Sequence, residues 1–200
     1  MTGKKELVSG KGTIVGDDVI VTKWIGLEGT FIIAGKREQE LNRHFNPSFI
    51  RGVKGFAELL PTFNDTGAVS GSEMHFIREV SECGIFGALW EMAEALKSGL
   101  NIEIKSIPIR QETIEICEYY RINPYWLLSG GSLLIAAPDG YGIVSKLIAK
   151  GLNAAVIGKI TAGNDRLLLN GEGRRYLEPP KGDEINKVVG ILQREAENNL

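Results

Sequence analysis

The pattern of apolar and polar residues changes its period near the middle of the chain, at residues 81–84. From Glu73 to Val80 apolar and polar side chains roughly alternate, which predicts a half-buried β-strand. After the change the apolar residues recur at helical spacing; they are Ile85, Leu89, Met92, Ala93 and Leu96. Ser81 belongs to the residue types that favour the N-cap of a helix, and Gly99 to those that follow a helix end. This segment therefore predicts a strand, a sharp turn at Ser81, and a helix that ends near Gly99.

Strand and helix patterns continue to alternate along the rest of the chain. Strands are predicted at residues 19–24 and 100–104, in a buried run that ends at Ala136, and at 154–160, with a hairpin around 171–173. Helices are predicted at about residues 31–45, 47–60, 110–120, 140–150 and 183–195. Thr30 is expected to cap the first of these helices and Asp139 the fourth. Such interleaving predicts an α/β (α+β) fold in which helices cover a mixed β-sheet.

The chain is expected to form one domain, because its 200 residues are enough for one sizeable core. Residues 1–11 are polar and are interpreted as an N-terminal arm or edge strand. Residues 12–200 are interpreted as a single domain. Residues 62–72 have loop composition, and the sequence leaves the structure of residues 61–73 open.

Composition and charge argue against several classes of function. The formal charge is −2 and the Lys and Arg residues are scattered, so we do not expect a nucleic-acid partner. No apolar run approaches the length of a membrane span, and no apolar core follows the N-terminal lysines, so we expect a cytoplasmic protein with no membrane partner. Cys83 and Cys117 lack the spacing of a disulfide framework or a zinc site, and Cys117 is expected in the core. Adjacent Asp17 and Asp18 fit a turn better than a metal site, so no metal is expected in this chain.

The first turn of the central helix is the candidate binding site. Gly84 and Gly87 leave it without bulk, and the free N–H groups and partial positive charge of a helix start suit a phosphate or carboxylate. The same residues also fit close packing of a helix on a sheet, which needs no ligand. Cys83 at this position has the option of a lowered thiol pKa, but Glu79 and Glu82 nearby oppose a thiolate.

Three segments resemble motifs of one known superfamily, in the same order along the chain. Residues 79–95 resemble the D-x-T-x-G-G-[LI] motif and following helix of the aminoimidazole ribonucleotide synthetase superfamily, and most closely its members related to the hydrogenase-maturation carbamoyl dehydratase. Residues 15–30 are similar to the start of the C-terminal domain in that superfamily. Residues 123–136 resemble the D-P-x-x-L-x-S-x-G-x-[LM]-L-I segment of the dehydratase-like relatives. The resemblance covers roughly residues 12–185.

The resemblance implies a substrate or phosphate site at the central turn. Glu79 takes the place of the family's aspartate, Ser81 that of its threonine, and Gly84 that of its second glycine, while Glu82 agrees with the dehydratase-like relatives. Cys83 replaces the first glycine, where a side chain would crowd a passing phosphate. The candidate substrate- and phosphate-binding residues are Glu79, Ser81, Glu82, Cys83, Gly84 and Ile85. No catalytic residue is assigned.

The resemblance also implies chemistry, but only for part of a protein. Superfamily members use ATP to phosphorylate an amide or carboxamide oxygen, a task of positioning and electrostatic stabilisation. Their N-terminal domain supplies the magnesium ligands and most of the ATP site, and this sequence resembles only the C-terminal domain. We therefore expect a substrate-side domain of an ATP-dependent synthetase or dehydratase that is inactive alone and binds no cofactor alone. ATP and Mg²⁺ would require a separate N-terminal nucleotide-binding polypeptide.

Two further expectations accompany this interpretation. The alternative function is a non-catalytic module that kept the fold and binds a metabolite or a protein. A homodimer is expected, because the resemblance implies domains that commonly pack in pairs and because the apolar residues Trp24, Trp90 and Trp126 exceed what a modest core needs to expose.

Overall fold

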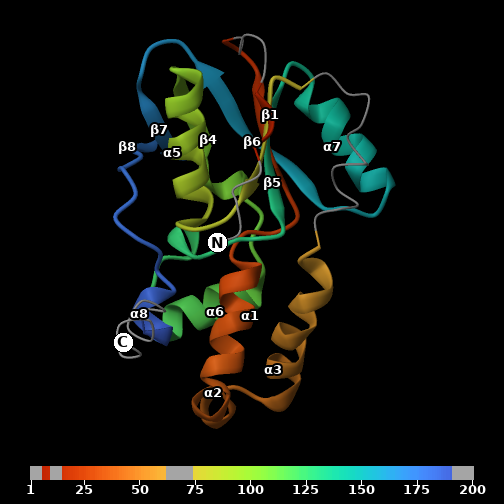
Figure 1. The fold of residues 1–200 in the computed structure, drawn as a ribbon, viewed down its shortest axis with the longest axis vertical. Coiled ribbons are helices and arrows are strands. Elements are labelled where there is room, and N and C mark those ends of the chain that lie inside the picture. Colours follow the sequence, from red (N-terminus) through yellow and green to blue (C-terminus); the bar gives the residue numbers. More distant parts are fainter. Residues whose placement is uncertain (1–5, 10–14, 62–73, 191–200) are drawn as a thin grey trace, which may run out of the picture.

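The computed structural model describes residues 6–9, 15–61 and 74–190, with side chains from residue 15 onward. Its strands are β1 (Glu6–Ser9), β2 (Asp18–Thr22), β3 (Phe76–Val80), β4 (Gly99–Glu103), β5 (Ser132–Ala137), β6 (Ala154–Thr161), β7 (Arg166–Asn170) and β8 (Gly173–Tyr176). They form one sheet in the order β1-β3-β5-β2-β6-β4-β7-β8 (Figure 1). Neighbouring strands run antiparallel, except that β4 and β7 are parallel. The sheet is therefore mixed, as predicted.

The helices lie in two groups. They are α1 (Leu27–Lys36), α2 (Glu38–His44), α3 (Pro47–Lys54), α5 (Gly84–Leu96), α6 (Gln111–Tyr120), α7 (Gly140–Ala149) and α8 (Asn186–Val189), with short 3₁₀ turns η1 (Gly55–Leu59), η2 (Ile104–Ser106) and η3 (Pro124–Trp126). Figure 1 shows α5 and α7 beside the sheet, and α1, α2, α3, α6 and α8 gathered below it. The predicted α/β class is confirmed.

Strand alternation divides the core into layers. Along β2, Val19 and Val21 face α5, while Ile20 faces α7, so this central strand is buried on both sides. Leu89 and Met92 on the apolar face of α5 fill the first layer, as their spacing predicts. The helical group has its own cluster of buried side chains; among its members are Leu27, Ile33, Phe56, Ile116, Cys117 and Leu127.

The predicted cap at Thr30 is wrong. α1 begins at Leu27, and its N-cap is Gly26, whose φ of 72° lies in the left-handed region that glycine adopts without strain. Thr30 lies one turn inside the helix, where its hydroxyl donates to the Gly26 carbonyl oxygen at 2.7 Å. The predicted helix over residues 31–45 is also divided in two at Arg37.

The predicted caps of the central helix are wrong too. α5 begins at Gly84 after Cys83, and no side chain caps it; the Ser81 carbonyl oxygen instead accepts the Gly84 N–H at 3.1 Å and closes a turn. At the other end Lys97 adopts the left-handed conformation, and Gly99 already belongs to β4. A Cβ on Gly99 would lie 2.5 Å from Thr161 Oγ1, so packing between strands explains this glycine.

Other local predictions are confirmed. The Asp139 carboxylate accepts the Gly142 N–H at 2.9 Å and caps α7, and β7 and β8 form the predicted hairpin. Cys117 is buried in the helical cluster. β1 lies at the sheet edge beside β3, while the boundary between residues 11 and 12 lies outside the described residues. So do nearly all of the stretch 61–73 and the predicted helix beyond residue 190.

None of the helices in the described part of the chain is long and apolar enough to cross a membrane.

Candidate functional site

The loop formed by residues 127–131, between η3 and β5, holds the most concentrated set of polar contacts near the predicted site. Four consecutive backbone N–H groups of this loop donate to acceptors from three separate segments, at residues 28, 79–81 and 183. The pairs are Leu128 to Asp183 Oδ1 (3.1 Å), Ser129 to the Ser81 carbonyl (3.2 Å), Gly130 to Glu28 Oε2 (3.0 Å) and Gly131 to Glu79 Oε1 (3.2 Å). The 127–131 loop is therefore lined by three carboxylates, each oriented by a backbone hydrogen bond.

The Ser129 side chain joins this loop to the start of α1. Its hydroxyl accepts the Gly26 N–H at 2.7 Å and donates to the Leu127 carbonyl oxygen at 2.7 Å, and the residue is fully buried. A Cβ on Gly29 would lie only 2.5 Å from Leu127 Cγ, so α1 approaches the loop closely because residue 29 has no side chain. The glycines of the Ile25–Thr30 segment thus have a packing role.

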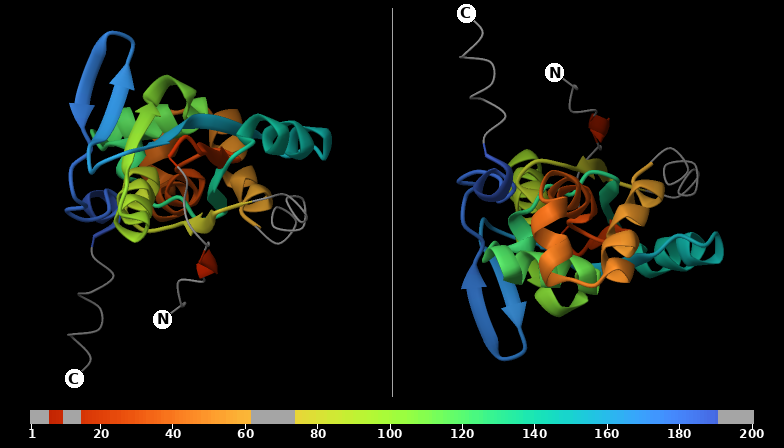
Figure 2. Two further views of the ribbon diagram at one scale, coloured as in Figure 1. Left: turned by 90° about the horizontal axis from the view of Figure 1, so that it is seen from above. Right: turned by 90° about the horizontal axis from the view of Figure 1, so that it is seen from below.

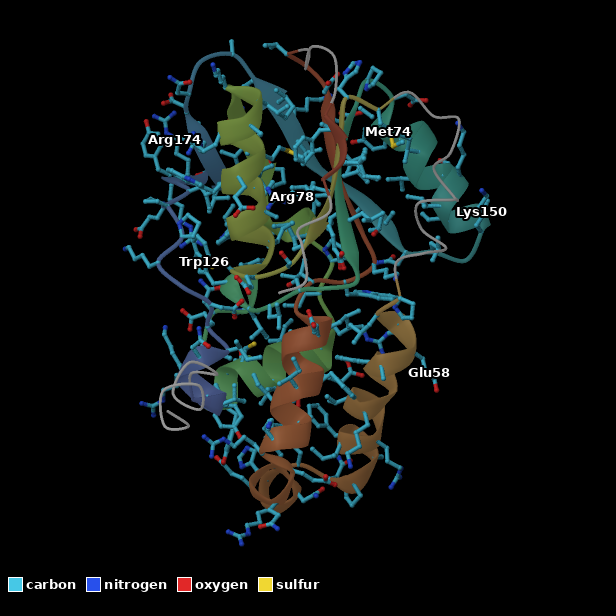
Figure 3. The ribbon with its side chains drawn as sticks, viewed as in Figure 1. Glu58, Met74, Arg78, Trp126, Lys150 and Arg174 are labelled. Carbon is cyan, nitrogen blue, oxygen red and sulfur yellow. The ribbon has the colours of Figure 1, made fainter. Side chains whose placement is uncertain are left out.

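Gly84 also packs closely, against η3. Its φ is 59°, and a Cβ there would lie 2.6 Å from the carbonyl oxygens of both Tyr125 and Leu127. Trp126 lies beside the start of α5 (Figure 3), where its ring meets Phe86 edge to face at 5.4 Å between centroids. At this glycine the structure supports the packing interpretation, because protein atoms fill the space above it.

A carboxylate of the chain itself lies at the start of α5. Asp183 Oδ2 accepts the Cys83 N–H at 2.7 Å, while Oδ1 accepts the N–H groups of Leu128 and Ile185. The helix start thus binds an anionic group, as its chemistry predicts, but that group comes from a segment one hundred residues later in the chain. Whether an external phosphate or carboxylate binds here stays a prediction.

Residues 182–189 hold Asp183 in place and are called the C-terminal strap. Ile185 and Val188 are buried in the helical cluster. The Arg37 guanidinium donates to the Val188 carbonyl oxygen, with Nε at 3.0 Å, and the Glu184 N–H donates to the Trp126 carbonyl oxygen at 3.3 Å. The strap therefore ties the helical group to η3 and to the start of α5.

The carboxylates perturb one another. Burial raises the pKa of Glu28, and the nearby charges of Glu79 and Asp183 raise it further, against the Gly130 hydrogen bond. Burial likewise raises the pKa of Asp183, although its three N–H donors oppose the shift. Burial, followed by the charge of Asp183, raises the pKa of the Cys83 thiol, which disfavours a reactive thiolate.

The raised pKa of Glu28 predicts a pH dependence of stability. The folded state binds a proton on Glu28 more tightly than the unfolded chain does, so this stabilisation is fully present below the ordinary value of 4.5. It is lost as the pH rises through the folded-state pKa. We expect Glu28→Gln, which keeps an acceptor for Gly130, to flatten the decline in unfolding free energy from acid to neutral pH, measured by urea denaturation. Glu118→Gln on an exposed part of α6 should leave the slope unchanged, and equal slopes in all three proteins would contradict the assignment.

The predicted site residues divide into three groups. In the first group, Glu79 accepts the Gly131 N–H of the 127–131 loop, and the Cys83 N–H donates to Asp183. The Ser81 carbonyl oxygen accepts the Ser129 N–H of the same loop. Glu82 is exposed. Gly84 and Ile85 are buried, and the Ile85 side chain belongs to the core beneath α5 and does not face the site. Glu28, Ser129 and Asp183, which complete the arrangement, lie in distant segments, and of these only the first two fall inside motifs that the resemblance covers.

Metal ligation has no visible basis in the described part of the chain, where no three His, Cys, Asp or Glu side chains are arranged to hold an ion. Asp17 lies 2.6 Å from His75 Nδ1. Asp18 accepts the Lys159 ammonium at 2.6 Å and the Gly140 N–H at 3.0 Å. Both aspartates thus bind groups of distant segments and hold them together.

Comparison with known proteins agrees with the predicted family and with the fold. The sequence profile of the family described as "AIR synthase related protein, C-terminal domain" matches residues 15–170. The chain belongs to this family. The match includes all three segments in which the family motifs were found, so the predicted resemblance to the AIR synthase superfamily is confirmed.

Individual members of the AIR synthase family are similar to this chain in sequence and in structure. The carbamoyl dehydratase HypE of Rhizobium leguminosarum bv. viciae is 27% identical over 180 residues, which are 86% of this chain and 49% of the relative. The crystal structure of E. coli HypE superposes with a TM-score of 0.67 at 18% identity, over 88% of this chain and 53% of that one. The structure of the hydrogenase maturation protein HypE in complex with ATP superposes with a TM-score of 0.66 at 15% identity, over 90% of this chain and 55% of that one. These structural matches show the fold, and the chain spans about half the length of the curated relatives it matches.

Proposed function

We propose that this chain is the substrate-side domain of an ATP-dependent synthetase or dehydratase of the AIR synthase superfamily, and that a separate nucleotide-binding polypeptide supplies ATP and Mg²⁺. Family membership and the carbamoyl dehydratase relatives support the assignment to ATP-dependent synthetases or dehydratases. Phosphoryl transfer needs metal and triphosphate in line with the acceptor. The described residues hold no metal-binding cluster, so these parts are assigned to the partner.

The three carboxylates on the 127–131 loop carry the proposal. Glu28 and Glu79 each accept one backbone N–H, whereas Asp183 accepts three, and a carboxylate has about four acceptor sites. Glu28 and Glu79 therefore keep acceptor capacity in fixed orientations. A carboxamide presents two N–H donors, which such carboxylates bind, while its oxygen stays free to accept a phosphoryl group. An amide or carboxamide substrate thus fits the carboxylates of Glu28 and Glu79 better than a phosphate does.

The proposal predicts weak or undetectable binding of ATP and Mg²⁺ to the chain alone, because the metal ligands and triphosphate contacts lie in the partner. Isothermal titration calorimetry measures this directly. Micromolar affinity with a requirement for Mg²⁺ would contradict the division of labour between two polypeptides.

Complementation tests the function itself. The chain is mixed with the isolated nucleotide-binding half of a HypE relative, and carboxamide-dependent ATP hydrolysis is followed, with the relative's own two halves as positive control. We expect activity that Glu28→Gln and Glu79→Gln each lower by about tenfold to a hundredfold, the value of one hydrogen bond to a charged group. Glu118→Gln should have no effect.

One observation favours the alternative, a non-catalytic binding module. The Cys83 N–H at the start of α5 is already bound to Asp183, and Cys83 takes the place of a glycine of the family motif. If the control halves hydrolyse ATP and no mixture with this chain does, the binding module is the better assignment.

A further inference from the structure

A groove of about 470 Å³ lies on the sheet face opposite α5. Its lining includes Val15, Asn101, Glu103, Tyr141, Lys159 and Leu169, and it is called the β4–β6 groove. On the same side α7 packs over the central strands. In Figure 2 the β7–β8 hairpin and α7 lie at opposite ends of the sheet, and the strands that form the groove lie between them. A volume of this size is typical of a small-molecule site.

Strand alternation and register place two opposite charges on the floor of the groove. Leu100 and Ile102 of β4 are buried against α5, so Asn101 and Glu103 point to the opposite side. Lys159 of β6 is aligned with Asn101 of β4 in the strand register. Glu103 lies two residues further along β4, so its Cβ is about 7 to 8 Å from that of Lys159, on the diagonal. The groove thus has a cation on one strand and an anion on the next.

The cationic end of the groove has a fixed orientation. The Lys159 ammonium donates to Asp18 Oδ1 at 2.6 Å, and this hydrogen bond raises the pKa of Lys159, so the group stays charged. Asp18 also accepts the Gly140 N–H at the start of α7, which binds part of its negative charge. An ammonium group has three donors, so two remain. Together with the hydroxyl of Tyr141, which is 69% exposed, they suit a carboxylate.

The polar groups on β4 are free to bind a ligand. Within the described part of the chain, neither the half-buried Asn101 amide nor the exposed Glu103 carboxylate takes part in a hydrogen bond or an ion pair. A carboxylate only accepts hydrogen bonds and suits an ammonium group, whereas a side-chain amide both donates and accepts, as a peptide group does. The groove therefore offers a cation, an amide and an anion in that order.

Apolar side chains supply the rest of the groove. Val15 is 59% exposed beside β6, where the Gly16 N–H donates to the Ile160 carbonyl oxygen at 2.9 Å and holds this segment in place. Leu169 of β7 is aligned with Glu103 in the register and lies on the same face. Apolar surface beside a few oriented polar groups is the usual composition of a ligand site.

We propose that the β4–β6 groove binds a zwitterion of dipeptide length, with its carboxylate at Lys159 and its ammonium group at Glu103. Two extended residues span about 7 Å, which is comparable with the separation of these two side chains. A free amino acid carries both charges on one carbon and reaches only one of them. The peptide group lies over the Asn101 amide, and an apolar side chain packs on Leu169 and Val15. The groove lies across the sheet from α5, so this inference does not depend on the proposed function.

Titration of the full chain with glycyl-leucine, followed by isothermal titration calorimetry, tests the site. We expect saturable binding with a dissociation constant between about 10 μM and 1 mM. N-acetylglycyl-leucine lacks the ammonium group and glycyl-leucine amide lacks the carboxylate. Each should bind at least about tenfold more weakly, the value of one hydrogen bond between charged groups. Free leucine should also bind at least about tenfold more weakly, because it leaves one end of the groove unpaired.

Two charge variants assign the two ends of the ligand. Glu103→Gln should bind glycyl-leucine and its N-acetyl form equally, and should keep the preference for a free carboxylate. Lys159→Gln should lose the preference for the carboxylate over the amide, and should keep the preference for a free ammonium group. Glu118→Gln on an exposed part of α6 should behave as the parent chain does. Circular dichroism confirms that each variant is folded.

Three results overturn the proposal. The first is a folded parent chain that does not bind glycyl-leucine at about 10 mM. The second is binding in which both charge variants keep both preferences. The third is an affinity for glycyl-leucine that falls as the chain concentration rises and a dimer forms in sedimentation velocity, which assigns the groove to a second copy.

Discussion

Gly84→Ala is expected to lower the free energy of unfolding by about 3 kcal/mol, the sum of a left-handed backbone penalty and the cost of overpacking. The backbone at residue 84 has a φ of 59°, which favours glycine. The added methyl group would lie 2.6 Å from the carbonyl oxygens of Tyr125 and Leu127. Because these are backbone atoms, relief requires η3 to move away from α5.

Gly151→Ala is the matched control for this variant. Residue 151 follows α7 with a φ of 78°, and no heavy atom lies within 4 Å of the position of its Cβ. It therefore tests the backbone penalty alone, about 1 to 2 kcal/mol. Urea denaturation measures the loss of unfolding free energy in each variant, provided that the m-values are unchanged. The difference between the two losses is the cost of the contact with η3. Equal losses in the two variants would show that Gly84 is kept for something other than packing.

The overall fold follows from sequence features that act locally. Apolar spacing along α5 and the alternation in β3 and β4 determine which side chains reach the core, and a period can be identified without knowing what packs there. The Asp139 cap was predictable for the same reason, since its acceptor and its donor lie three residues apart. The order of strand and helix signals then indicated a mixed sheet with helices around it.

The caps at Ser81 and Thr30 were predicted wrongly because a cap depends on the backbone conformation of the turn before the helix. Both helices begin after a residue in the left-handed conformation, Cys83 and Gly26. Glycine permits that conformation, whereas cysteine gives no signal of it. As a result α1 begins four residues before its predicted start, and α5 begins two residues after its predicted start.

The candidate site was only half predictable, since its members meet through tertiary contacts. Glu79, Ser81 and Cys83 lie together in one motif and were selected by resemblance. Asp183 lies one hundred residues later in a Gly- and Pro-rich segment that has no periodic pattern. Its role became visible only when the strap placed its carboxylate on the N–H groups of Cys83 and Leu128.

Asp183→Ala is expected to destabilise the protein by about 2 to 4 kcal/mol, because the N–H groups of Cys83 and Leu128 lose their acceptor in a half-buried place. Desolvation of the lost carboxylate, visible in its raised pKa, offsets part of this cost. Asp139→Ala is the control, since it removes an exposed aspartate cap from α7 at a cost of about 1 kcal/mol.

The anion response separates the two variants. In the parent chain Asp183 occupies the start of α5, so sulfate and phosphate should hardly change the midpoint of thermal unfolding. In Asp183→Ala the same N–H groups and the positive helix end are open to an external oxyanion, so either salt should recover part of the lost stability, beyond the effect of chloride at equal ionic strength. Asp139→Ala opens only the single exposed Gly142 N–H at the start of α7, so its recovery should be smaller. If sulfate, phosphate and nucleotide act equally on both variants, the start of α5 is a packing contact closed by Asp183, and any substrate must bind through Glu28 and Glu79 instead.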